Sequence, residues 1–128
     1  MTPPSWLNDL VRAFGRQMGL SRFELTERGV AGVQFENGFA LRFEYAGEAL
    51  MLSIGQPVPA EPAVMRSLLA AVHPGVRLPV RLRAAYLAKS GEAVYVVRIP
   101  ERQVTVTRLE SVFRVLWQAA DRLKRSVA

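Results

Sequence analysis

The sequence predicts an α+β fold, with helices packed on an antiparallel sheet in the order α-β-β-β-α-β-β-α. Three patterns support this prediction. Residues 30–55 alternate apolar and polar side chains around two turns, as antiparallel strands with one buried face do. Residues 82–87 repeat the alternation, and after one further turn residues 93–99 are rich in the β-branched and aromatic side chains that favour a strand. Near both ends of the chain, apolar residues recur at three- and four-residue spacing, which is typical of amphipathic helices.

The first helix is expected to begin at Ser5, whose hydroxyl can accept from a free amide of the first turn. Gly19 suits the positive-φ position that ends a helix. Residues 21–29 then form a connector, with a possible short extended piece at 23–25. The apolar stripe of this helix, which more often marks a core than a binding surface, is Leu7, Leu10, Val11, Phe14 and Met18.

A three-stranded meander is expected next, because two turn signals divide residues 30–55. Asn37-Gly38 favours a type I′ hairpin turn, which needs two positive-φ residues. A second turn is expected at residues 46–48. We expect residues 56–59 to leave the ladder, because proline has no amide to donate.

A short apolar helix and two more strands follow. Glu61 and Pro62 suit a first helical turn, and Pro74-Gly75 suits its end. With so few charges, this helix is expected to be buried on two sides or to lie at a subunit interface. Strands are predicted at 82–87 and 93–99 around a turn at 89–92. The last helix is expected to begin with a capping box formed by Thr107 and Glu110.

The composition is that of one folded domain spanning residues 1–128. The chain has no cysteine, which excludes disulfides and thiolate sites. No apolar run approaches the ~20 residues of a membrane span, and the first residues lack signal-peptide features. A cytosolic location and no membrane partner are therefore expected.

The net charge of +6 is carried unevenly along the chain. Residues 77–128 hold 11 basic and 4 acidic side chains, whereas residues 1–76 hold 6 and 7. A solvated surface explains this best, because the arginines are scattered. The main alternative is a small basic nucleic-acid-binding α+β module, although the large aromatics lie in apolar patterns and offer no stacking platform. Its phosphate-facing residues would be Arg98, Arg102, Arg108 and Arg114.

Residues that carry chemistry are scarce. The one histidine, His73, precedes a Pro-Gly break, where a turn role is expected. No His, Cys or carboxylate cluster has metal-ligand spacing, and no glycine-rich loop joins a strand to a helix. We therefore expect no catalytic residue, no metal and no cofactor. A third hypothesis, an enzyme whose site is completed at a dimer interface, lacks the titratable cluster it would need.

The element order and several local sequences resemble a known family. They are Met18-Gly19-Leu20, residues 50–54, Leu68-Leu69 before the Pro-Gly break, residues 95–100, and Trp117 to Ala120. In these features the chain resembles the class I chaperones of bacterial type III secretion, the Tir-chaperone (CesT-like) family. The resemblance covers nearly the whole chain.

This resemblance implies an ATP-independent, non-enzymatic protein in the cytoplasm of a Gram-negative bacterium. It would bind the N-terminal region of a secreted effector or secretion regulator and keep that region soluble and competent for secretion. The effector would add a strand to a sheet edge and place apolar side chains on apolar patches. By position, the effector-binding candidates are Leu10, Phe14, Phe39, Leu41, Phe43 and Met51.

Members of this family dimerise through the second helix and the strand after it, so a homodimer is expected here, with a heterodimer as the alternative. Most members are acidic, whereas this chain has a pI of about 10.7. The difference implies an acidic cargo, a partner subunit of opposite charge, or a different family. The dimer-interface candidates are Val64, Leu68, Leu69, Val72, Leu82, Ala84 and Tyr86.

Overall fold

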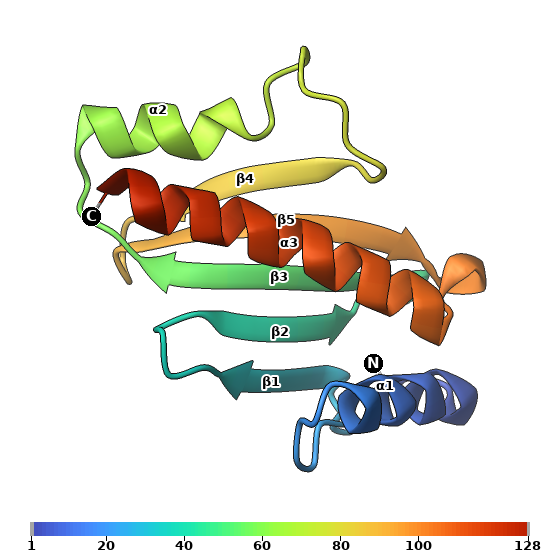
Figure 1. Ribbon diagram of the computed structural model, residues 1–128. Helices are drawn as coiled ribbons and strands as arrows, with labels where there is room; N and C mark the ends of the chain where they lie inside the picture. Colours follow the sequence, from blue (N-terminus) through green and yellow to red (C-terminus); the bar gives the residue numbers. More distant parts are fainter. Residues whose placement is uncertain (1, 128) are drawn as a thin grey trace.

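The computed structural model describes residues 2–127 and shows a five-stranded antiparallel sheet with three helices (Figure 1). The strand order is β1-β2-β3-β5-β4, so β1 and β4 are the edges. This architecture confirms the predicted α+β class and element order. The helices are α1 (Ser5–Gln17), α2 (Pro62–Ala70) and α3 (Val106–Val127), and the strands are β1 (Val30–Gln34), β2 (Ala40–Tyr45), β3 (Ala49–Pro57), β4 (Leu82–Leu87) and β5 (Glu92–Pro100).

The N-cap of α1 lies one residue earlier than predicted. Pro4 is the N-cap, its carbonyl accepts from the Leu7 amide at 3.1 Å, and no side chain caps this end. Ser5 is already helical, so the prediction that its hydroxyl caps the helix is wrong. Gly19 has φ 71° and ends the helix as expected.

The connector after α1 forms no strand, contrary to the possible extended piece at residues 23–25. Its backbone is held by the side chain of Asn8 instead. The Asn8 Oδ1 atom accepts from the Leu25 amide at 2.8 Å, and its Nδ2 atom donates to the Leu25 carbonyl at 3.3 Å. These two hydrogen bonds satisfy the backbone amide and carbonyl of Leu25, which have no neighbouring strand to pair with.

The β1–β2 hairpin has a different turn from the one predicted. Only Gly38 of the Asn-Gly pair has positive φ, at 94°, so the prediction of a type I′ turn is wrong. The Gly38 amide donates to the Phe35 carbonyl at 3.0 Å, and the Phe35 amide donates to the Phe39 carbonyl at 2.8 Å. This pattern is that of a turn closed by a left-handed glycine bulge. Asn37 contributes its side chain, which accepts from the Phe39 amide at 3.0 Å.

Strand β3 continues to Pro57, two residues beyond the predicted end of the ladder. Pro57 lies opposite Glu92 of β5, whereas pairing with β2 ends at Gly55. The Val58 amide donates to the Gly91 carbonyl on the β5 side, so the proline nitrogen faces the side where β2 has ended. A missing donor on that side removes no ladder hydrogen bond.

Helix α3 is capped two residues before the predicted box. The Thr105 hydroxyl oxygen accepts from the Arg108 amide at 3.0 Å, and the Thr105 carbonyl accepts from the Leu109 amide at 2.9 Å. Thr107 and Glu110 therefore lie inside the helix, and the capping-box assignment is wrong. The buried stripe is the predicted one, with Leu109, Val112, Leu116, Ala120 and Leu123 facing the sheet.

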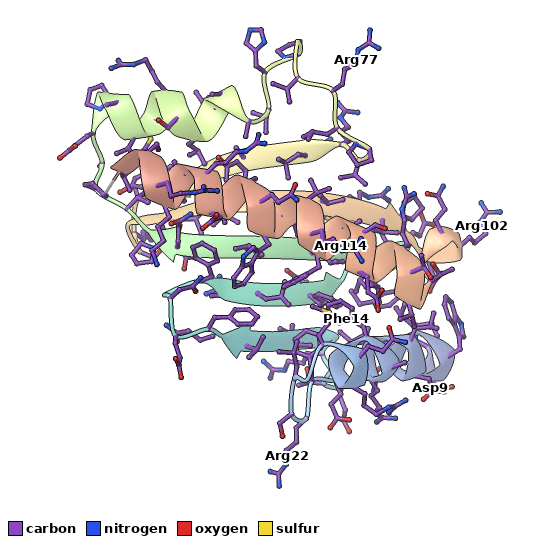
Figure 2. All side chains as sticks on the ribbon, viewed as in Figure 1. Asp9, Phe14, Arg22, Arg77, Arg102 and Arg114 are labelled. Atoms are coloured by element: carbon purple, nitrogen blue, oxygen red, sulfur yellow. The ribbon has the colours of Figure 1, made fainter. Side chains whose placement is uncertain are left out.

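All three helices lie on one face of the sheet. Helix α3 crosses β3 and β5, α2 lies beside it toward β4, and α1 lies near β1 at one end of the sheet (Figure 1). Phe14 of α1 reaches the space between α1 and α3 (Figure 2). Its ring centroid lies 5.3 Å from that of Phe43 on β2 and 5.9 Å from that of Phe113 on α3. The core is therefore one-sided.

The cap of α3 gives a direct test. Thr105→Ala should lower the free energy of unfolding by about 1 kcal/mol, because the Arg108 amide loses its acceptor. Thr107→Ala is the matched control and should be neutral or raise stability by a few tenths of a kcal/mol, since alanine favours a helix interior. Urea denaturation followed by circular dichroism measures both. Equal losses in the two variants would contradict the corrected cap.

Candidate functional site

Residues 2–127 contain no group of three or more His, Cys, Asp or Glu side chains that could hold a metal ion. His73 has the turn role expected for it: its Nδ1 atom accepts from the Gly75 amide at 3.0 Å. No helix within the described residues is both long and apolar enough to cross a bilayer. The candidate sites are accessible apolar surfaces.

The first of these surfaces is a cavity of about 260 Å³ between the β1–β2 hairpin and α3. We call it the aromatic pocket. Its residues are Phe35, Phe113, Arg114, Trp117 and Gln118. The ring of Phe35 lies edge-on to that of Trp117, with centroids 5.0 Å apart, and Phe113 lies 5.6 Å from Trp117. All three aromatic side chains are only partly buried, so they offer apolar surface to solvent.

The fold explains why this pocket stays open. Helix α1 covers one end of the β1–β2 hairpin, and the hairpin turns at the other end (Figure 1). The pocket lies near that turn, because its residue Phe35 is hydrogen-bonded across the turn to Gly38 and Phe39. There the hairpin is fixed to α3 by Lys124, whose Nζ atom donates to the Asn37 carbonyl at 2.8 Å and lies 5.6 Å from the Phe39 ring centroid. The pocket therefore has two anchored walls and no covering element among the described residues.

The second surface lies between α2 and α3. Here a cavity of about 330 Å³ is lined mainly by apolar side chains of α2, α3 and the loop before β4, with Tyr95 and Arg122 also lining it. We call it the α2–α3 groove. Beside it, Leu69 is 57% exposed. Val76 and Leu78 of the loop are also exposed.

Tyr95 ties α2 to the sheet beneath this groove. Its hydroxyl donates to the Leu68 carbonyl at 3.0 Å, near the end of α2, where carbonyls lack helical partners. Burial raises the pKa of Tyr95 to about 12. The end of α2 is thus held by β5.

The six effector-binding candidates do not share one surface. Phe14, Phe39, Leu41 and Phe43 are 0% exposed and form part of the core, so they offer no surface to a partner in this conformation. Leu10 is partly exposed and packs against the core, and Met51 is partly exposed on the face without helices. A role in effector binding stays a prediction for this set.

The residues of the aromatic pocket were not among the predicted binding residues. Phe113 and Trp117 belong to the apolar stripe of the last helix, and Phe35 alternates correctly along its strand. Periodicity indicates which face of an element is apolar. It does not indicate where the neighbouring element ends. These rings are accessible because no neighbouring element extends over them.

The dimer-interface candidates divide by exposure. Val64, Leu68 and Leu82 are buried within the chain. The other four are exposed or partly exposed and lie on α2, just after it, or on the edge strand β4: Leu69, Val72, Ala84 and Tyr86. These four are available to a partner. The two-sided burial considered for α2 is not provided by the described chain, because Leu69 points outward.

The arginines of the nucleic-acid alternative do not form one surface. Arg98 lies on the face of the sheet away from the helices, by its register in β5. Arg108 is an exposed residue of α3. Arg114 lies on the same helix, across the sheet from Arg98, and Arg102 lies in the turn Glu101–Gln103 at the end of the sheet (Figure 2). A single duplex or strand could not contact all four at once.

Comparison with known families and structures gives a consistent result. The family model described as Type III secretory system chaperone SycN matches residues 6–124. Comparison with curated proteins finds no match.

Among solved structures, the chain is similar to one in the ExsC–ExsE complex, with a TM-score of 0.77, 19% identity, and 99% of this chain and 97% of that one covered. It is similar to a chain of the HopA1–SchA chaperone–effector complex, with a TM-score of 0.64, 20% identity, and 95% and 99% covered. It is also similar to a chain in the complex of the Yersinia pestis type III secretion chaperone SycH with a fragment of YscM2, with a TM-score of 0.67, 16% identity, and 95% and 99% covered. These structures share the fold.

Tyr95→Phe tests the link between α2 and the sheet. We expect the free energy of unfolding to fall by about 1–3 kcal/mol, because the Leu68 carbonyl loses its donor in a buried place. Because the folded pKa is raised from 10.0 to about 12, the protonated phenol contributes stability that is complete below pH 10 and lost as the pH rises toward 12. Urea titrations across this range should show a smaller alkaline loss in Tyr95→Phe than in the wild type.

Tyr86→Phe on β4 is the control, since Tyr86 is only partly buried. It should follow the wild-type pH dependence. If Tyr95→Phe also showed the wild-type pH dependence, the loss of stability at alkaline pH would come from a group other than Tyr95.

Proposed function

Because this chain belongs to the SycN family of type III secretion chaperones, we propose that it binds the N-terminal region of an exported effector or secretion regulator and keeps that region soluble and secretion-competent. The HopA1–SchA structure, one chain of which shares the fold, is a chaperone–effector complex. The protein would act in the bacterial cytoplasm as a single domain, by binding rather than by catalysis and without ATP.

The aromatic pocket is the observation that carries this proposal. Three partly exposed aromatic rings border a cavity large enough for an apolar side chain. Burying apolar surface gives roughly 25 cal/mol per Å², and aromatic rings supply much of it. An unfolded segment exposes such side chains, so this pocket suits a non-native cargo.

The edge strand β1 gives the cargo a second kind of contact. Within the sheet β1 pairs only with β2. The outward amide and carbonyl of Val30 are bonded to Thr26, so the rest of the outer edge, residues 31–34, can accept an added strand. Its sequence, Val30–Gln34, carries no charge to discourage pairing. Phe35 follows β1 directly, so a segment paired along this edge would reach the aromatic pocket.

We further propose that two subunits associate through α2 and β4, where Leu69, Val72, Ala84 and Tyr86 are accessible. The exposed apolar side chains of the neighbouring loop would be buried there as well. Residues 61–89 carry five basic side chains and one acidic one. A homodimer formed through this region therefore brings like charges together, and salt should strengthen it by screening.

Phe35→Ser tests the pocket. After the cargo is identified by pull-down from the native host, its N-terminal fragment should bind about tenfold more weakly to this variant, because one wall of the pocket is lost. Trp6→Ser is the matched control, since Trp6 is 46% exposed on α1 outside the pocket. Isothermal titration calorimetry gives both affinities.

Binding that Phe35→Ser leaves unchanged would remove the pocket from the cargo site. A nuclease-sensitive capture, with nucleic acid in place of a protein, would overturn the chaperone function.

Leu69→Asp tests the dimer. Sedimentation of the wild type should show self-association that strengthens as salt rises, and Leu69→Asp should remain monomeric at the same concentrations, because a carboxylate replaces an exposed apolar contact. Met18→Asp, at an exposed apolar position just after α1, is the control and should dimerise as the wild type does. A wild type that is monomeric at every salt concentration would contradict a homodimer.

A further inference from the structure

The face of the sheet opposite the helices bears a distinct set of side chains. We call it the helix-free face. Alternation along the strands places Arg98 and Val96 of β5, Met51 of β3 and Arg83 of β4 on it, since their neighbours in sequence face α3. Met51 lies opposite Arg98, and Arg83 lies opposite Val96. These residues form one contiguous area across three strands.

Positive charge on this area is not balanced. Arg83 and Arg98 are diagonal neighbours on adjacent strands, about 7–8 Å apart, and both are exposed. Among the described residues neither forms an ion pair. Glu44 lies on the same row as Arg98 but on β2, two strand spacings or about 10 Å away.

The carboxylate that could compensate this charge is already engaged. Glu92 of β5 lies over Gly55 of β3 and reaches Arg42 of β2, with Oε1 to Nη1 at 3.4 Å. Glu92 therefore compensates the charge of Arg42 on β2 and not that of Arg83 or Arg98. Arg81, just before β4, and Arg102, just after β5, lie at the same end of the sheet as Arg98 and add further positive charge.

Apolar side chains lie between and beside these arginines. Met51 and Val96 are partly exposed, and Leu87 at the other end of β4 is 43% exposed. In the described strands, no aromatic side chain points to this face, so bases would find no stacking platform. The combination of aliphatic surface with exposed arginines fits a polypeptide better than a nucleic acid.

We infer that the β4–β5 half of the helix-free face binds an acidic segment of the exported cargo. Its carboxylates would pair with Arg83 and Arg98, whose planar guanidinium groups can hold a carboxylate with two parallel hydrogen bonds. Its apolar side chains would contact Met51 and Val96. This inference rests on the proposed chaperone function and assigns a role to the basic excess of the chain.

A second copy of the chain is a poorer occupant for this face. A two-fold pairing would bring the same patch against itself and oppose its unbalanced arginines. An acidic cargo segment is instead attracted by the positive potential of these arginines. The same potential speeds the encounter of the segment with the protein.

A direct test uses a short synthetic peptide in which glutamate alternates with valine, titrated into the isotope-labelled full chain. Amide shifts in the nuclear magnetic resonance spectrum should concentrate at Met51, Val96 and Arg98. The double variant Arg83→Glu/Arg98→Glu should bind at least about tenfold more weakly, because two attractive contacts become repulsive. Arg28→Glu/Arg108→Glu changes the net charge equally at exposed sites elsewhere, and we expect its affinity to stay within about twofold of wild type.

Unchanged affinity in Arg83→Glu/Arg98→Glu, or shifts located elsewhere, would overturn the inference. So would a single-stranded oligonucleotide that binds these residues more tightly than the peptide. If circular dichroism showed that the double variant does not fold, Arg83→Gln/Arg98→Gln should show a smaller loss of affinity. One further outcome separates this site from the chaperone function: cargo binding that depends on Phe35, together with peptide binding that depends on neither arginine. That result would contradict only the site on the helix-free face and would still support the chaperone function.

Discussion

The packing of Phe14 is the contact on which the arrangement of the helices depends. Its ring, carried by α1, lies close to the rings of Phe23 in the connector, Phe43 in the sheet and Phe113 in α3. One side chain therefore joins α1 and the connector after it to β2 and α3. Because α1 is held at this point, it covers one end of the β1–β2 hairpin and leaves the other end to the aromatic pocket.

The strands were predictable because their signal is local. Alternation identified β2 and β4, and β-branched and aromatic composition identified β5, and the structure confirms these three strands. The errors concern details that depend on neighbouring atoms. The cap of α3 is Thr105 and not Thr107, because the Thr105 hydroxyl accepts from the Arg108 amide. The two threonines are two residues apart, and sequence spacing alone did not choose the right one. Pro57 remains in the ladder because β2 happens to end beside it.

The candidate site was far less predictable. An apolar residue at the right period is either core or accessible, and only the ends of neighbouring elements decide which. Phe39 and Phe35 illustrate this point. They flank the same turn, yet Phe39 is fully buried beneath Trp117 while Phe35 stands at the rim of the pocket. Helical and strand periodicity treats the two alike, so no sequence pattern separated them.

Gly55 has a consequence for how this protein can change over evolutionary time. A Cβ atom at this position would lie 2.9 Å from Cδ of Glu92. A larger residue would therefore shift the carboxylate of Glu92 away from Arg42. An uncharged substitution there would change where the charges lie on this face without changing the net charge. Positions 42, 55 and 92 are thus expected to drift together among descendants of this gene, as a linked trio spread over three strands.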